Sequence, residues 1–381
     1  MKLLLSLVCC LAVLAPVPVL ASARTNIPVK EATQGDDTVR SLNAQRRRAV
    51  LNNDFEAMNM LGHRYQEGNG VTLDYGTAVE WYRKAAEQGH AASQVDLGFM
   101  YDRGFGVEQN FQTAFMWYRR AAEQGHKIGQ YNLGVSYADG QGVARDDNEA
   151  VKWYRQSAGQ EYYLAEANLG FMYEMGRGVE QDLAEAVRLY TLAAEKGNDV
   201  AQANLGFMYA NGRGTARNDE KAVRWYRKAA DGGNAAAQNN LGFMYDEGRG
   251  VKRDHAEALR LYRLAADQND VVAWYNIGEI YDEGRGVDED ASEAAKWYMQ
   301  AAGEGYPTAL YRLGLLYRDG RGVDWNPTLG LAYLILAAER ETGDKKPSYA
   351  HSRDLLAETL PPPQRTKAEE TSMDLSRHFR K

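Results

Sequence analysis

The stretch that decides the fold is AQNNLGFMYDEGRGV, residues 237–251. It contains the pair Leu241 and Gly242, a tyrosine four residues after the leucine, and a Gly-x-Gly three residues after the tyrosine. The same pattern recurs at a constant spacing of 36 residues, once with isoleucine in place of leucine. Its eight copies are centred on Leu61, Leu97, Leu133, Leu169, Leu205, Leu241, Ile277 and Leu313. A constant period of this length is the signature of a repeat protein.

Each repeat has the pattern of two helices. If the leucine is position 0, the residues at positions −4, 0 and +4 fall on one face of a first helix. The Gly-x-Gly ends this helix, because glycine readily adopts the left-handed backbone of a helix stop. An Asp or Asn then caps a second helix by accepting hydrogen bonds from its first turn. The predicted caps are Asp74, Asn110, Asp146, Asp182, Asn218, Asp254, Asp290 and Asn326.

Small residues at positions −4 and +1 predict that helix axes approach closely. Trp-Tyr pairs such as Trp225 and Tyr226 are then expected to fill the space between repeats. One repeat cannot bury its apolar face alone, but a stack of repeats buries a continuous core. The predicted fold is therefore all-α: an α/α superhelical solenoid of eight 36-residue helix-turn-helix repeats with helical N- and C-terminal caps.

The flanking segments predict export and capping. Residues 1–23 combine Lys2, an apolar run and a small-residue site, which is typical of a secretory signal peptide. Residues 24–52 are expected to form a lead and a capping helix, residues 53–342 the eight repeats, and residues 343–381 a helical C-terminal cap. The protein is therefore expected to be periplasmic or secreted, without stable insertion in a membrane after cleavage of the signal.

The motif resembles the Sel-one-like repeat family, a relative of the tetratricopeptide repeats. The resemblance covers about residues 53–342. It implies a right-handed superhelix whose first helices line the concave side. Exported members of the family act in virulence, signalling and envelope assembly, so the resemblance implies a scaffold for protein or peptide partners.

Catalytic and cofactor chemistry is not expected. Both cysteines, Cys9 and Cys10, lie in the predicted signal, so the remaining chain has no thiol for a disulfide or a metal. The six histidines lack the spacing of a helical zinc motif, and His90 and His126 fit a turn position. The net charge of −7 argues against general nucleic-acid binding. A β-lactamase-like or other cell-wall hydrolase remains as the alternative, although the chain contains no Ser-x-x-Lys.

The predicted partner-binding residues lie on the outward face of the first helices. Positions −4, 0, +1 and +4 are expected to point inward, and positions −2, −1, +2 and +5 outward, where asparagine amides match a peptide backbone and aromatic rings provide apolar anchors. The predicted residues are Phe99, Tyr131, Asn132, Asn168, Phe171, Asn204, Phe207, Asn240, Phe243, Tyr275 and Asn276. In the alternative interpretation, asparagine bonds the backbone of the neighbouring repeat and phenylalanine packs between adjacent first helices. Two roles stay open for the scaffold: a periplasmic regulator or assembly factor, and a secreted virulence-type factor.

Overall fold

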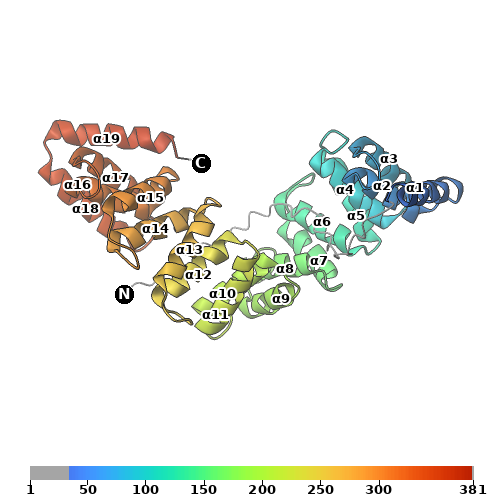
Figure 1. The fold of residues 1–381 in the computed structure, drawn as a ribbon, viewed down its shortest axis with the longest axis horizontal. Helices are drawn as coiled ribbons and strands as arrows, with labels where there is room; N and C mark the ends of the chain where they lie inside the picture. The colour runs from blue at the N-terminus through green and yellow to red at the C-terminus, as the bar shows by residue number, and fades with distance from the viewer. Residues whose placement is uncertain (1–33, 380–381) are drawn as a thin grey trace. The chain divides into compact units, whose positions relative to one another are not determined.

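Helices account for the regular secondary structure of the described residues. The computed structural model describes residues 34–379, which form nineteen helices and contain no strand (Figure 1). The predicted all-α class is therefore confirmed. The predicted signal, residues 1–23, and the first part of the predicted lead, residues 24–33, lie outside the described residues.

Sixteen helices form eight pairs that follow the 36-residue period. The first helices of the repeats are α2 (Phe55–Glu67), α4 (Ala91–Arg103), α6 (Lys127–Asp139), α8 (Tyr163–Met175), α10 (Asp199–Asn211), α12 (Ala235–Glu247), α14 (Val271–Glu283) and α16 (Pro307–Asp319). The second helices are α3 (Tyr75–Ala86), α5 (Phe111–Glu123), α7 (Asp147–Ala158), α9 (Leu183–Glu195), α11 (Asp219–Asp231), α13 (His255–Ala266), α15 (Ala291–Gly303) and α17 (Pro327–Arg340). The flanking helices are α1 (Gln34–Leu51), α18 (Lys346–Thr359) and α19 (Pro362–Arg377).

The described chain divides into two compact units. The N-terminal unit comprises residues 34–201 and 213–215, and the C-terminal unit comprises residues 202–212 and 216–379. Repeats 1–4 therefore belong to the N-terminal unit, and repeats 6–8 belong to the C-terminal unit.

Every second helix begins at its predicted cap residue. The Asn110 side-chain oxygen, for example, accepts a hydrogen bond from the Thr113 N–H at 2.8 Å, and the other seven caps accept equivalent bonds. Such a bond satisfies a donor that the first helical turn leaves without a partner. His90 and His126 cap α4 and α6 in the same way through Nδ1, which confirms that they are turn residues.

The two glycines of the Gly-x-Gly have different roles. Gly104 ends α4 with a left-handed φ of 71°, as predicted. Gly106 is also left-handed, with a φ of 69°. A Cβ atom on Gly106 would lie 2.4 Å from the carbonyl carbon of Tyr75, the first residue of the second helix in the preceding repeat. The second glycine therefore lets the turn of one repeat contact the preceding repeat.

The glycine at position +1 brings the two helices of one repeat together. A Cβ atom on Gly206 would lie 2.6 Å from Cδ1 of Tyr226, a fully buried ring on α11. The predicted close-packing role of this glycine is therefore confirmed. Tyr226 fills the space between the two helices of its own repeat. It also packs in a core with Leu241 of the next repeat, in the predicted space between repeats.

Extra helices cover both ends of the repeats. In the N-terminal unit, Leu42 of α1 packs with Leu61 of the first repeat. In the C-terminal unit, Leu356 of α18 and Ala368 of α19 pack with Leu334 of α17. Between residues 34 and 379, none of the helices has the length and apolar character needed to span a membrane.

Candidate partner-binding face

Positions −2 and +5 of the first helices are mostly buried, in contrast to the prediction. At position −2, the Tyr131 and Tyr275 side chains are 3% and 8% exposed. The ring centroid of Tyr131 lies 5.4 Å from that of Tyr162, and the ring centroid of Tyr275 lies 5.4 Å from that of Tyr306. Tyr162 and Tyr306 directly precede the first helix of the next repeat. At position +5, Asp246 is also buried. The reason is that a stacked first helix has neighbours on three sides, so its outward face is narrower than that of a helix on a globular surface.

Five of the predicted partner-binding side chains are therefore buried, and the expectation that they form an exposed face is wrong for them. These residues are Phe99, Tyr131, Asn132, Asn240 and Tyr275. The other predicted side chains, at positions −1 and +2, are half-buried. They are Asn168, Phe171, Asn204, Phe207, Phe243 and Asn276. We call positions −1 and +2 of the first helices the Phe–Asn face, and partner binding there stays a prediction.

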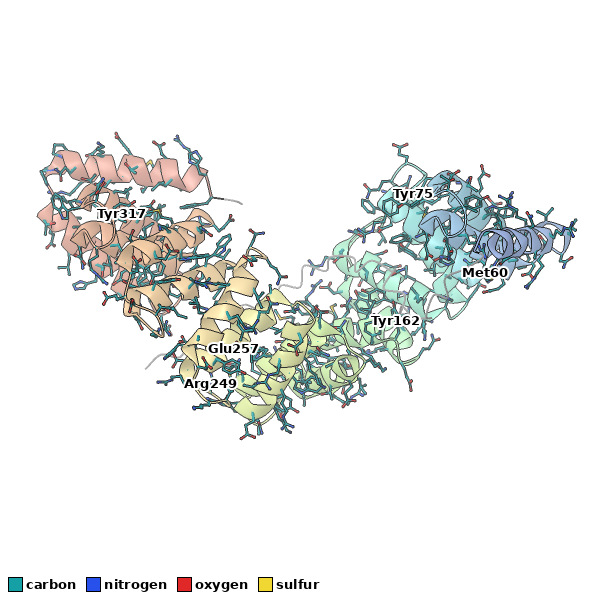
Figure 2. All side chains as sticks on the ribbon, in the orientation of Figure 1. Met60, Tyr75, Tyr162, Arg249, Glu257 and Tyr317 are labelled. Atoms are coloured by element: carbon teal, nitrogen blue, oxygen red, sulfur yellow. The ribbon has the colours of Figure 1, made fainter. Side chains whose placement is uncertain are left out.

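Arginine side chains lie over rings of the Phe–Asn face, among them the buried Phe99 and the half-buried Phe171 and Phe243. The guanidinium carbon of Arg177 is 5.9 Å from the centroid of the Phe171 ring, and that of Arg249 is 5.9 Å from the centroid of Phe243 (Figure 2 labels Arg249). Both arginines occupy the middle of a Gly-x-Gly. A cation at this distance is attracted by the ring and holds it in place.

Each of these arginines is itself held by an aspartate of the preceding repeat. Arg177 pairs with Asp147 and Arg249 pairs with Asp219, each at 2.7 Å. Hydrogen bonds from Arg177 and Arg145 lower the pKa of Asp147 to about 2. Burial raises the pKa of Asp219, but hydrogen bonds from its arginine partners outweigh burial and lower the pKa to about 2. Both carboxylates are therefore charged at neutral pH.

Sequence reasoning missed this arginine system. In the other Gly-Arg-Gly turns, the arginine pairs with an acid at position +5 of the preceding repeat. These pairs are Arg213 with Glu174, Arg285 with Asp246, and Arg321 with Asp282. Where position +5 of the preceding repeat is alanine, as in Ala138 and Ala210, the arginine pairs instead with the first residue of that repeat's second helix. These residues are Asp147 and Asp219. The recurrence of Gly-Arg-Gly and the exchange of acid positions are both visible in the sequence and could have revealed the pairs.

The asparagines at position −1 differ in their hydrogen bonds. Asn168 Nδ2 donates to the Tyr154 hydroxyl at 3.3 Å, and Asn276 Nδ2 donates to Asn239 Oδ1 at 2.8 Å. Both bonds are internal and join neighbouring repeats, but their acceptors are side chains and not the predicted backbone. Asn132 Nδ2 is buried without a hydrogen-bond partner among the described residues. Asn240 makes no side-chain hydrogen bond within residues 34–379.

Ion pairs replace the Phe–Asn pattern near both ends of the repeats. His63 Nε2 lies 3.3 Å from Asp96 Oδ2 in the N-terminal unit. Burial lowers the pKa of His63, but the hydrogen bond and charge of Asp96 outweigh burial and raise it. In the C-terminal unit, Arg312 donates to Glu279 at 2.8 Å. Both pairs join position +2 of one repeat to position −1 of the next.

The side chains of the Phe–Asn face are suited to non-covalent contacts, and the described residues contain no cluster for metal chemistry. Among residues 34–379, no group of three or more His, Cys, Asp or Glu side chains is arranged to hold a metal ion. What the face does present is amides and aromatic rings, which suit hydrogen bonding and apolar contact.

The comparison with protein families identifies the repeat. The model of the Sel1 repeat matches eight successive segments, residues 55–90, 91–126, 127–162, 164–198, 199–234, 235–270, 272–306 and 307–341. The predicted number of repeats and the resemblance to this family are confirmed. Among curated protein sequences, no relative matches. Sel1 repeats form helical scaffolds that are typical of protein–protein interaction and are generally non-catalytic.

Two solved structures share the fold. One is a protective antigen present in uropathogenic Escherichia coli strains, which displays an SLR fold; it is 33% identical, with a TM-score of 0.72 over 88% of this chain and 71% of the antigen. The other is a Sel1 repeat protein from Oxalobacter formigenes, 32% identical, with a TM-score of 0.58 over 64% of this chain and 96% of that protein. The eight repeat matches and these two structures lead to one conclusion: this chain belongs to the Sel1 repeat family.

Proposed function

We propose that this chain is an exported scaffold that binds a protein or peptide partner on the Phe–Asn face. Its membership of the Sel1 repeat family supports a role in protein–protein interaction. The signal peptide predicted in residues 1–23 supports export. The partner-binding residues of this proposal are the half-buried members of the face.

The observation that carries the proposal is the pair of arginine-backed rings, Phe171 and Phe243. Each ring is half-buried, so part of it is left for a partner to cover. Each is held by an arginine that an aspartate fixes in turn. A rigid aromatic anchor loses little conformational entropy on binding, which is why such side chains provide much of the affinity of protein interfaces.

Site-specific photo-crosslinking tests this function. A photoreactive phenylalanine analogue is placed at Phe171 or Phe243 in the producing cell, and the crosslinked products are identified by mass spectrometry. The control positions are Met116 and Met299, exposed side chains on second helices. We expect one partner to crosslink from the two Phe positions and not from the Met positions. Equal products from all four positions, or none from the Phe positions, would contradict the proposal.

Two cellular locations are compatible with the proposed function. A periplasmic regulator or assembly factor is consistent with export alone. A secreted or surface role has one observation in its favour, the 33% identity to a protein described as a protective antigen. Cell fractionation of the producing organism distinguishes them: the protein is recovered with periplasmic contents in the first case, and on the surface or in the medium in the second.

The alternative of a β-lactamase-like hydrolase predicts a different result. A hydrolase of this class would turn over nitrocefin at a rate that follows the protein through successive purification steps. We expect no such activity, since the chain has no Ser-x-x-Lys to supply a nucleophile and its lysine.

A further inference from the structure

The two ion pairs near the ends of the repeats occupy the same register as the Phe–Asn pairs. Glu279 and Arg312 lie 36 residues after Phe243 and Asn276, which in turn lie 36 residues after Phe207 and Asn240. The Glu279–Arg312 contact of 2.8 Å shows that position +2 of one repeat meets position −1 of the next. The C-terminal unit therefore contains this pair of positions three times. The first two pairs combine an aromatic ring with an amide, and the third combines two opposite charges.

The charged version is closed by its own contact. Arg312 and Glu279 are each less than one-third exposed, so the pair is partly removed from water. A partner that covered this pair would have to desolvate both charges, and it could not improve on a hydrogen bond that they already make. An uncharged segment of a partner therefore gains nothing by extending across Glu279 and Arg312.

The Phe–Asn version keeps hydrogen-bonding atoms that a partner can use. The half-buried Asn276 amide donates one N–H to Asn239 and keeps its second N–H and its oxygen. A primary amide presents a donor and an acceptor that match the C=O and N–H of an extended backbone. Positions −1 and +2 carry no ionisable group from Asn204 to Asn276, and Arg249, which lies over the Phe243 ring, is paired with Asp219. The chemistry of this stretch therefore favours an uncharged extended segment.

The same arrangement, in reverse order, occurs in the N-terminal unit. His63 and Asp96 form the closed pair at 3.3 Å, and Asn59 Nδ2 also donates to Asp96 at 2.7 Å. One repeat later, the same positions hold Phe99 and Asn132. The charged pairs thus lie in the first and last repeat interfaces, on the outer side of the uncharged positions in each unit.

We propose that the Glu279–Arg312 pair ends the partner-binding part of the Phe–Asn face in the C-terminal unit, and that this part binds an extended, uncharged polypeptide segment through Asn276, Phe207 and Phe243. The His63–Asp96 pair is the corresponding limit in the N-terminal unit. The inference rests on the proposed scaffold function and adds to it the chemistry of the bound segment and the position at which binding stops.

The test transfers the closing pair to a neighbouring register. In one variant, Phe243→Glu with Asn276→Arg copies the charged pair one repeat earlier. In the reciprocal variant, Glu279→Phe with Arg312→Asn copies the uncharged pattern one repeat later. The probe is a phage-displayed library of random 12-residue peptides selected on the purified chain, and binding of the selected peptides is measured by fluorescence anisotropy. Thermal unfolding followed by circular dichroism verifies that each variant is folded.

We expect the selected peptides to be apolar and free of charge in their central positions. The first variant should bind them at least tenfold more weakly, and the reciprocal variant should bind them as tightly as the unmodified chain or more tightly. If the first variant fails to fold, loss of binding in the reciprocal variant would still contradict the inference.

Other outcomes would overturn the inference. Peptides enriched in acidic or basic residues would refute the uncharged occupant, and the absence of selected peptides would refute an extended segment. Unchanged binding by the first variant would refute the limit at Glu279 and Arg312. In each case, specific crosslinking from Phe171 and Phe243 would leave the scaffold function standing, so the two failures are distinguishable.

Discussion

Two interfaces between successive repeats use different chemistry at the same register. Between repeats 1 and 2, the Phe105 ring stacks on Tyr75 with centroids 4.9 Å apart and planes inclined by 12°. Four repeats later, the same positions hold Arg249 and Asp219, which form an ion pair at 2.7 Å. The first residue of each pair lies between the glycines of a Gly-x-Gly, and the second begins the second helix of the preceding repeat.

The difference teaches which part of the interface is fixed. The glycine that follows Phe105 and the one that follows Arg249 have φ values of 69° and 66°. A Cβ atom on either would lie within 2.4 Å of the backbone of the preceding repeat. The backbone contact is therefore common to both interfaces, whereas the side-chain pair beside it can be aromatic or ionic.

The largest expected effect comes from breaking what the two interfaces share. Gly106→Ala and Gly250→Ala should each destabilise the chain by about 3 kcal/mol or more, because alanine adds left-handed strain and a clash with backbone atoms that cannot move aside. Urea unfolding followed by circular dichroism measures both. Gly233→Ala is the matched control, since Gly233 has a φ of 91° but open space around its Cβ position. A cost at Gly106 and Gly250 equal to that at Gly233 would remove the backbone contact as the shared element.

A smaller effect is expected from exchanging the side-chain pairs. Arg249→Phe alone should cost roughly 2 kcal/mol, because it deprives the half-buried Asp219 of a charged hydrogen-bond partner. Adding Asp219→Tyr transfers the aromatic pair of the first interface and should recover most of the loss, since replacing an ion pair with packed apolar groups is often close to neutral. The unfolding free energies of the single and double variants test this. A double variant less stable than the single one would show that the two interfaces are not interchangeable.

The fold could be predicted from the sequence because its determinants are local and repeated eight times. The cap at Asn110 and the helix stop at Gly104 each depend on residues within a few positions, so the pattern specifies them directly. The close packing at Gly206 was predictable for the same reason, since a glycine in a helix at constant register needs a packing explanation.

The candidate site was less predictable because exposure depends on stacking. Helical periodicity places Tyr131 and Tyr275 on the side opposite the leucine, but it does not indicate how much of that side the adjacent repeats cover. The partner of each arginine was hidden for a related reason: Arg249 and Asp219 are 30 residues apart and meet only when successive repeats stack. The half-buried rings of Phe171 and Phe243 were identified from the sequence, but the arginines that hold them were not.

The smallest expected effect is a loss of stability at acid pH, which the ion-paired interface should show and the aromatic interface should not. Arginine partners lower the pKa values of Asp147 and Asp219 to about 2 from 3.8. A carboxyl group with a lowered pKa in the folded state stabilises the fold above its unfolded pKa, and this contribution is lost as the pH falls through the folded pKa. Each pair should therefore lose on the order of 1 kcal/mol between about pH 4 and pH 2, after allowance for solvent screening.

Asp139 should act in the opposite direction and at higher pH. Burial raises its pKa to about 6, although the charges of Arg177 and Arg145 oppose the rise. A raised pKa means that the folded state binds the proton more tightly, so stability should increase as the pH falls from about 6 to 4. Urea midpoints measured from pH 7 to pH 2.5 should therefore rise and then fall. Asp139→Asn should reduce the rise, and the double variant Asp219→Tyr with Arg249→Phe should reduce the later fall, because the aromatic pair has no group that titrates in this range. If the urea midpoint of the double variant fell as much at low pH as that of the unmodified chain, the ion pair at this register would contribute no more to stability than the aromatic stack that replaces it.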